Sequence, residues 1–253
     1  MDQQNYYRLW AEVDLDAIRS NVLKLQKNLG NGVKTCAVIK ADGYGHGALA
    51  LADTLDDLVD FYAVATMEEA LELRSQQVQK PILILGYVHP SQAEEAILQE
   101  IRLTVFSLNM AQQISDAAER LHRSAKIHIK VDTGMSRIGF FPDRESARIV
   151  QTIHEFPGIE IEGLFTHFAC ADAQYLDSAR KQLEKFLSFS RMLEESGIRI
   201  PVRHCSNSAA ATCLREADLD MVRLGISIYG LYPSEFVHQQ ELVPALSLKS
   251  HII

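Results

Sequence analysis

The sequence lacks any apolar stretch long enough to cross a membrane, and it is poor in basic residues. Lysine and arginine together number 25, against 33 aspartate and glutamate residues, which gives a net charge of −8. A chain with this balance lacks the broad positive surface that attracts nucleic acids and anionic membranes. We therefore expect neither kind of partner, although a local basic pocket for one phosphate group is compatible with the composition.

Cysteine is scarce as well, because the 253 residues include only Cys36, Cys170, Cys205 and Cys213. No two of them have the spacing of a CxxC motif, and no cysteine and histidine have the spacing of metal ligands. We interpret them as reduced thiols and expect no metal site. The N-terminus has no basic segment followed by an apolar one, so it does not resemble a secretory signal. These features predict a cytoplasmic protein.

What the sequence does contain is a regular alternation of short apolar runs with amphipathic segments. Asp14, Thr66, Asn109 and Asp143 are expected to begin helices, Thr66 within a capping box with Glu69. Eight such alternations within one chain of this length predict a (β/α)8 TIM barrel, with a doubly wound open sheet as the alternative. The expected strands are residues 34–40, 60–66, 81–86, 102–107, 125–132, 159–167, 200–208 and 221–230.

The end of the sequence does not fit this alternation. Leu246, Leu248, Ser250 and Ile252 alternate with other residues as in a strand, and no turn or helix cap follows them. An apolar strand without a partner is an aggregation hazard in a finished domain. We therefore expect that a C-terminal portion is missing from this chain.

In a barrel of parallel strands, the active site lies at the carboxyl ends of the strands. Polar residues near the ends of the expected strands are therefore candidates. They are Lys40, Asp132, Arg137, His167, Asn207, Ser208 and Arg223.

The segment "AVIKADGYGHG" places Lys40 directly before a glycine-rich loop. The glycine spacing matches neither a dinucleotide-binding fingerprint nor a Walker loop. A lysine amine at the end of a buried strand can attack an aldehyde to form a Schiff base. The pattern alone also allows a solvated lysine that has no chemical role.

A second candidate feature follows the last two expected strands, where barrels of this kind commonly bind phosphate. Ser208 can donate its hydroxyl hydrogen, and the amides of Gly225 and Ile226 can add donors because glycine lets a ligand approach closely. Alternatively, Ser208 only caps a helix and Gly225 only allows the barrel to bend.

Five segments resemble the N-terminal barrel of alanine racemases, which use pyridoxal 5′-phosphate (PLP). They are "AVIKADGYGHG", "VDTGMSRIGF", "GLFTHFACAD", "CSNSAA" and "MVRLGISIYGLYP", and they occur in the family's order over residues 9 to 253. The resemblance implies a TIM barrel over residues 10–240. It also implies that residues 241–253 begin a truncated C-terminal β domain.

The resemblance assigns roles around PLP. Lys40 resembles the lysine that holds the cofactor and then acts as one of two proton-transfer bases, so the resemblance favours a chemical role for it. Tyr44 resembles a tyrosine that contacts the phosphate, together with Ser208, Gly225 and Ile226.

Arg223 resembles the arginine that pairs with the pyridine nitrogen; from the pattern alone, a salt bridge across the barrel mouth is the alternative. Arg137 resembles the arginine beside the substrate carboxylate. Lys130 matches a lysine that is often carbamylated, with an unmodified lysine paired to Asp132 as the alternative. His167 resembles the histidine beside the pyridine ring, which Asn207 supports.

The full-length protein is then expected to interconvert L- and D-alanine as a homodimer and to supply D-alanine for peptidoglycan. The second base implied by the resemblance is a tyrosine in the partner's C-terminal domain, so this chain is expected to bind PLP but to racemise poorly. Neither Tyr229 nor Tyr232 is expected to replace it. The alternatives are a non-catalytic PLP-carrying barrel of the cofactor-homeostasis type, a sensor or scaffold barrel, and a racemase for another amino acid such as serine.

Overall fold

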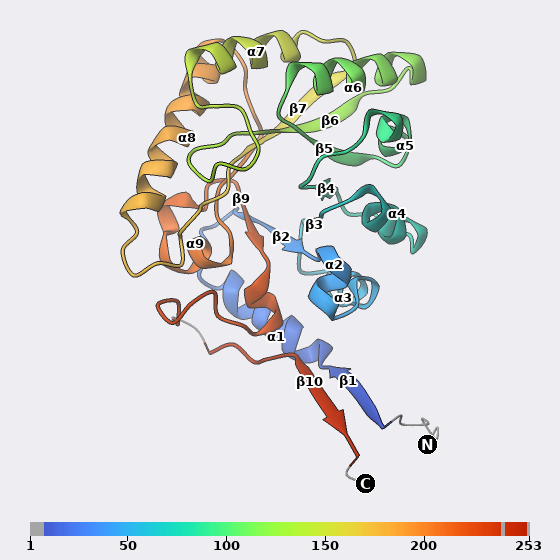
Figure 1. The fold of residues 1–253 in the computed structure, drawn as a ribbon, viewed down its shortest axis with the longest axis vertical. Helices are drawn as coiled ribbons and strands as arrows, with labels where there is room; N and C mark the ends of the chain where they lie inside the picture. Colours follow the sequence, from blue (N-terminus) through green and yellow to red (C-terminus); the bar gives the residue numbers. More distant parts are fainter. Residues whose placement is uncertain (1–7, 239–240, 252–253) are drawn as a thin grey trace.

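Eight parallel strands form the centre of the molecule (Figure 1), in a computed structural model that describes residues 8–238 and 241–251. They pair in the order β8-β7-β6-β5-β4-β3-β2-β9. The strands are β2 (Lys34–Val38), β3 (Phe61–Val64), β4 (Ile82–Ile84), β5 (Ile101–Val105), β6 (Ala125–Lys130), β7 (Ile159–Phe165), β8 (Val202–His204) and β9 (Met221–Leu224). The predicted (β/α)8 barrel is therefore confirmed.

The two outer strands of this order, β8 and β9, meet without forming a regular ladder. The amide of Asp220 donates to the carbonyl of Arg203 at 3.1 Å, and the amide of Arg223 donates to that of Ser206 at 3.0 Å. The Arg203 side chain adds an ion pair with Asp220 at 2.9 Å. These contacts nearly close the sheet, so the alternative of a doubly wound open sheet is wrong.

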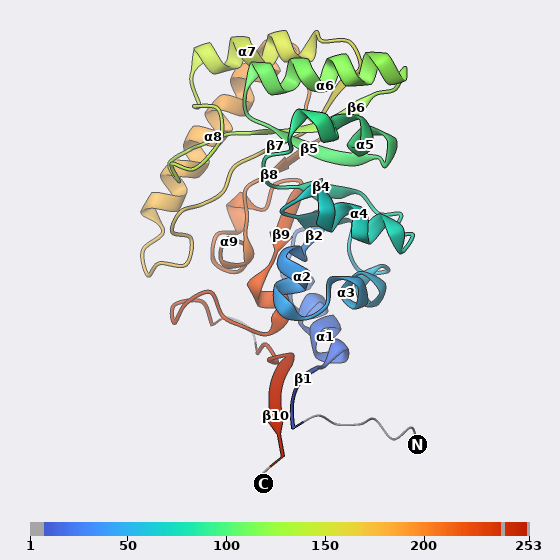
Figure 2. The same ribbon diagram turned by 45° about the vertical axis from the view of Figure 1, so that its right-hand side comes forward.

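Helices surround the barrel, as Figures 1 and 2 show from two directions. Among the residues described, none of these helices is both long enough and apolar enough to span a membrane. The α-helices are α1 (Leu15–Gln26), α2 (Lys40–Gly45), α3 (Ala48–Leu55), α4 (Met67–Ser75), α5 (Ala93–Leu98), α6 (Leu108–Leu121), α7 (Arg144–His154), α8 (Asp177–Glu195) and α9 (Ser208–Cys213). Three short 3-10 turns are η1 (Pro90–Gln92), η2 (Arg215–Ala217) and η3 (Ile226–Tyr229).

Most of the predicted helix starts are observed. The side chains of Asp14, Thr66 and Asp143 each accept a backbone N–H in the first turn of their helix. The start predicted at Asn109 is wrong, because Ser107 caps α6 and accepts the amide of Met110 at 3.2 Å. A serine oxygen two residues earlier thus satisfies the free amide that the prediction assigned to asparagine.

The tail strand has a partner, contrary to expectation. β10 (Leu246–Ser250) pairs antiparallel with β1 (Leu9–Val13), a strand that was not predicted. Both views show this two-stranded sheet projecting away from the barrel (Figures 1 and 2). Ile252 lies outside the described residues. The division at residue 240 stays a prediction, although β1 pairs with β10 rather than with the barrel.

The segment after β2 differs most from the prediction. The strand ends at Val38, and Ala41, Asp42, Gly43 and Tyr44 all have positive φ angles between 50° and 60°. Lys40 therefore begins a left-handed turn instead of ending a strand. Such a turn costs L-residues about 1–2 kcal/mol each and needs support. Asp42 supplies some by accepting the Ala48 amide at 2.8 Å.

Other predicted strand ends are also too long, for a related reason. The run 200–208 leaves the sheet after His204, and the run 221–230 becomes the turn η3 after Leu224. In both places the backbone bends to bring polar groups over the end of the barrel.

The left-handed turn predicts a specific sensitivity at Gly43. A Cβ atom there would lie 2.3 Å from the Leu51 side chain, at a φ of +60°. We expect Gly43→Ala to lower the free energy of unfolding by at least about 2 kcal/mol, combining strain with overpacking. Denaturant unfolding followed by circular dichroism measures this loss.

Gly32→Ala is the matched control, because Gly32 has a φ of +80° but no atom within 4 Å of the added methyl group. It should cost only the backbone strain of about 1 kcal/mol. Equal losses in the two variants would show that the turn does not pack against α3 as described.

Candidate active site

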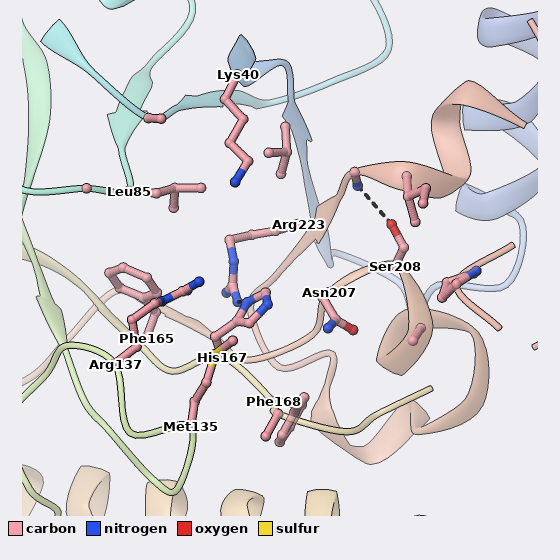
Figure 3. Close-up of a pocket in the computed structure, with 18 of the residues that line it drawn as sticks. Lys40, Leu85, Met135, Arg137, Phe165, His167, Phe168, Asn207, Ser208 and Arg223 are labelled. Carbon is pink, nitrogen blue, oxygen red and sulfur yellow. Dashed lines mark hydrogen bonds between the residues drawn. The ribbon is translucent and has the colours of Figure 1, made fainter. Parts of the chain in front are cut away.

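A pocket of about 620 Å³ lies at the carboxyl ends of the strands (Figure 3). It brings together side chains from the segments that follow β2, β7 and β8 with others on β6 and β9. Eleven candidate residues were named from the sequence, and Asp132 is not among the residues that line the pocket. The ten that line it are Lys40, Tyr44, Lys130, Arg137, His167, Asn207, Ser208, Arg223, Gly225 and Ile226.

The pocket is strongly basic. Lys40, Lys130, Arg137 and Arg223 line it, against the acidic side chain of Asp172. Figure 3 shows Lys40 extending into the same space as Arg137 and Arg223. Because several positive charges in a confined space attract anions, the pocket suits a ligand that carries phosphate or carboxylate groups.

Arg223 is almost completely buried, at 3% exposure. Its guanidinium donates to the carbonyls of Thr166 at 2.8 Å, His204 at 3.0 Å and Cys205 at 3.1 Å. Burial lowers the pKa of Arg223 to about 10, which leaves it protonated at neutral pH. No carboxylate among the described residues pairs with it, so the alternative of a salt bridge across the barrel mouth is wrong.

Two imidazoles complete the surroundings of Arg223. Its NH1 group lies 2.9 Å from Nδ1 of His204, and its NH2 group lies 3.2 Å from Nδ1 of His167. Burial and the Arg223 charge lower the pKa of His167 to about 3, so this ring is neutral and accepts through Nδ1. The Nε hydrogen of Arg223 has no partner among the described residues, which leaves one donor of a buried cation for a ligand.

Ser208 and Gly225 make a contact that changes their predicted parts. The Gly225 amide donates to Oγ of Ser208 at 2.8 Å, and the Ser227 amide lies 3.4 Å from the same oxygen. Gly225 is therefore not a free donor, whereas the Ser208 hydroxyl hydrogen is left to point elsewhere. Asn207, not Ser208, caps α9, since its Oδ1 accepts the Ala210 amide at 3.0 Å.

Tyr44 reaches this corner of the pocket from the left-handed turn. A Cβ atom on Gly225 would lie 3.5 Å from the Tyr44 hydroxyl and 4.0 Å from Oγ of Ser208. Because Gly225 has no side chain, the hydroxyl groups of Tyr44 and Ser208 can both approach this corner of the pocket. The Tyr44 ring packs against Tyr229, whose own hydroxyl donates to the Val38 carbonyl at 3.0 Å.

Lys130 does not pair with Asp132, so the alternative of an unmodified lysine paired to Asp132 is wrong. Its amine donates to the Val131 carbonyl at 2.9 Å. Burial and the charge of Arg223 lower the pKa of Lys130 to about 7. Asp132 instead accepts four backbone amides of residues 134–137, at 2.9–3.1 Å, and so shapes the loop that carries Arg137.

Several residues of the site were missed. Phe165 lies close to two cations, with its ring centroid 5.4 Å from Lys130 Nζ and 5.4 Å from Arg223 Cζ. His128, Glu162 and His204 form a polar row inside the barrel beneath Arg223. Polar residues in the middle of otherwise apolar strands were the signal that could have indicated them.

The cysteines and the acidic residues form no further site in the described part of the chain. Cys36 and Cys205 are buried, Cys213 is half-buried, Cys170 is exposed, and all four are free thiols. Nowhere in residues 8–238 and 241–251 do three His, Cys, Asp or Glu side chains gather closely enough to hold a metal ion.

These features define a class: an α/β barrel that gathers a lysine amine, cations and hydroxyl groups at the carboxyl ends of its strands. The family model described as "Alanine racemase, N-terminal domain" matches residues 13–233. The chain belongs to the alanine racemase family.

Curated relatives and solved structures agree with this assignment. An alanine racemase of Methanococcus maripaludis is 46% identical over 244 residues, which is 95% of this chain and 65% of the relative. An alanine racemase of Clostridium difficile 630 in complex with cycloserine superposes with a TM-score of 0.96 at 42% identity, covering 98% of this chain and 69% of that one. An alanine racemase of Bacillus anthracis with bound L-Ala-P gives 0.91 at 35% identity, covering 96% and 64%. The chain thus spans about two thirds of the length of the proteins it matches.

The lowered pKa of Lys130 predicts how stability depends on pH. The folded chain releases this proton near pH 7 and the unfolded chain near pH 10.5, so the unfolded chain binds more protons between these values. Stability should therefore rise with pH in that window, by at most about 1.4 kcal/mol per pH unit. Urea unfolding of the cofactor-free chain in carbonate-free buffer measures the slope.

Lys130→Met should remove this slope, whereas Lys126→Met, a half-exposed lysine on the same strand, should keep it. The slopes of the three chains are compared with one another at each pH, because unfolded cysteines, which are half ionised at about pH 8.5, lower the slope of all three alike. An equal slope in the wild type and in Lys130→Met would show that Lys130 is not the titrating group.

Proposed function

We propose that this chain is the PLP-binding barrel of an enzyme that interconverts L- and D-alanine. Its relationship to alanine racemases supports this proposal. The observation that carries it is the convergence, in one basic pocket, of a lysine amine with a buried arginine that keeps a donor free. We further propose that the full-length protein acts as a cytoplasmic homodimer and supplies D-alanine for peptidoglycan.

The pocket residues fit the groups of PLP. The unpartnered Nε hydrogen of Arg223 matches an acceptor such as a pyridine nitrogen. The Ser208 hydroxyl hydrogen and the nearby Tyr44 hydroxyl match a phosphate. Gly225 and Ile226 line the same corner and leave room there. When bound, PLP supplies an electron sink that acidifies the Cα hydrogen of an amino acid.

Lys40 has two tasks in this proposal. Its amine holds the cofactor at the aldehyde carbon, and after release it moves a proton at Cα of alanine. Removal and return of a proton on opposite faces needs two bases. We propose that the second is a tyrosine from the C-terminal domain of the partner subunit.

Arg223 limits how strongly the sink acts. Its pKa of about 10 keeps its own proton in place at neutral pH. A cation that only donates leaves the pyridine nitrogen without a proton, which weakens electron withdrawal. An arginine at this position therefore favours proton transfer at Cα over side reactions that need stronger electron withdrawal. His167, which is neutral, and Asn207 are proposed to lie beside the ring.

Arg137 is proposed to bind the carboxylate of the substrate, since a guanidinium can make two parallel hydrogen bonds to it. Its exposure at the mouth of the pocket suits a ligand that arrives from solvent. Lys130 is proposed to carry a carbamate that orients Arg137. A pKa near 7 supports this, because only the neutral amine reacts with carbon dioxide. The intact mass of carbonate-saturated protein distinguishes the two forms.

Borohydride reduction tests the cofactor. After incubation with PLP, reduction should fix the cofactor on Lys40, and peptide mass spectrometry should find the added mass on the peptide that contains it. Lys40→Ala should lose this label. Lys27→Ala, which changes an exposed lysine at the end of α1, should keep it. A folded chain labelled equally with and without Lys40 would contradict the proposal.

Turnover tests whether Lys40 is one of two proton-transfer bases. With PLP and alanine in deuterated water, Lys40 alone should exchange the Cα hydrogen of one enantiomer. Inversion should be at least about 100-fold slower than in a full-length alanine racemase, since one proton-transfer group is worth roughly 10²–10⁴-fold. Nuclear magnetic resonance and chiral chromatography measure exchange and inversion separately.

Inversion at the full-length rate would refute the assignment of the second base. A chain that is labelled on Lys40 but exchanges no Cα hydrogen would instead favour the non-catalytic cofactor-carrying barrel. Faster exchange with serine than with alanine would favour the alternative substrate.

A further inference from the structure

A continuous row of polar side chains crosses the interior of the barrel below Arg223. NH1 of Arg223 lies 2.9 Å from His204 Nδ1, and His204 Nε2 lies 2.8 Å from His128 Nδ1. His128 Nε2 lies 3.1 Å from Oε2 of Glu162, and Arg102 Nε donates to the same oxygen at 3.1 Å. The row links the pocket to the charged side chains near the amino ends of β5 and β6.

The two ends of the row decide where every hydrogen lies. Arg223 has only donors, which favours a neutral His204 that accepts through Nδ1 and carries its hydrogen on Nε2. Ionised Glu162 has only acceptors, which favours a neutral His128 that carries its hydrogen on Nε2. The two preferences agree at the contact between the rings, where His204 Nε2 donates to His128 Nδ1. All the donors therefore point away from the pocket, and the two ends together favour one tautomer of each ring.

The barrel is built to hold this row. His128 and His204 are both 0% exposed. A Cβ atom on Gly163 would lie 2.2 Å from His128 Nδ1, so only glycine leaves space for the ring. The pairing of β6 with β7 shifts between Ile127 and His128 and skips Glu162. Such a bulge turns the carboxylate toward a position that a regular strand does not give it.

The expected charges agree with this geometry. Burial lowers the pKa values of both His128 and His204, which keeps the rings neutral. Burial raises the pKa of Glu162, but its bonds to His128 and Arg102 outweigh this and bring it to about 2. The carboxylate is thus ionised and remains an acceptor.

We propose that Glu162 is a positioning residue for Arg223, acting through the tautomers of His128 and His204. With Glu162 in place, NH1 of Arg223 stays fixed on His204, and the Nε hydrogen stays available for an acceptor in the pocket. Without this acceptor, His128 can move its hydrogen to Nδ1. His204 must then do the same, which sets a donor against Arg223. The link to catalysis rests on the proposed function, whereas the tautomers do not.

The test reads the tautomers directly, by nitrogen-15 nuclear magnetic resonance of histidine-labelled, cofactor-free protein. In the wild type, we expect both buried rings to be neutral and to carry the hydrogen on Nε2. Glu162→Met, which keeps the volume but removes the acceptor, should shift both rings away from this state. Glu162→Gln keeps an amide oxygen that can accept from His128, so both rings should keep the wild-type tautomers. Glu160→Gln, on the same strand but half-exposed and paired only with Lys126, is the control.

The effect on the pocket is measured as PLP affinity. Glu162→Met should raise the dissociation constant about tenfold, as the loss of a supporting partner commonly does, and Glu162→Gln by less than about threefold. Circular dichroism establishes that each variant is folded. A residue that only stabilises the barrel would change the unfolding midpoint without changing the tautomers.

Wild-type rings with the hydrogen on Nδ1, or with a positive charge, would overturn the proposal without any variant. So would a folded Glu162→Met that keeps both tautomers. If both rings show the expected tautomers but the chain binds no PLP, the role of Glu162 in setting the tautomers is supported and the proposed function is refuted. If Glu162→Met does not fold, Glu162→Leu takes its place, and a folded Glu162→Leu that keeps both tautomers would overturn the proposal.

Discussion

A buried guanidinium without a carboxylate partner is the constraint on which the centre of this molecule depends. Three carbonyls and two imidazoles share the charge of Arg223. An isolated charge inside a protein is costly unless hydrogen bonds satisfy it. The bend after His204 presents two of these carbonyls, and the polar row beneath supplies one of these imidazoles.

The same arrangement explains the electrostatics of the pocket. Burial lowers the pKa values of Lys130 and His167, and the charge of Arg223, which no carboxylate among the described residues neutralises, lowers both further. His167 is therefore neutral at neutral pH, and Lys130, with a pKa of about 7, is neutral in about half of the molecules. Lys130 and Arg223 both lie within cation–π distance of the Phe165 ring, whose negative face stabilises a nearby positive charge.

The sequence was sufficient for the barrel, because apolar alternation is a local property, and the resemblance of five segments to a known family was sufficient for ten residues of the pocket. It was insufficient where the outcome depends on long-range contacts. The pairing of β1 with β10 joins residues at opposite ends of the chain. The Gly225 amide could not be known to meet Ser208 until the segments that follow β8 and β9 were placed. His128 and Glu162 were overlooked because a strand pattern predicts their faces but not their bulge.

The left-handed turn after β2 has a further consequence for Lys40 and Tyr44. Both side chains enter the pocket from one short turn, whose pitch is fixed by four residues of the same unusual handedness. One inserted residue would rotate Tyr44 by roughly 100° about the axis of the turn while leaving Lys40 in place. The number of residues between Lys40 and Tyr44 therefore sets the separation between the amine and the phenol in the pocket. It thereby selects ligands whose two contacted groups are that far apart.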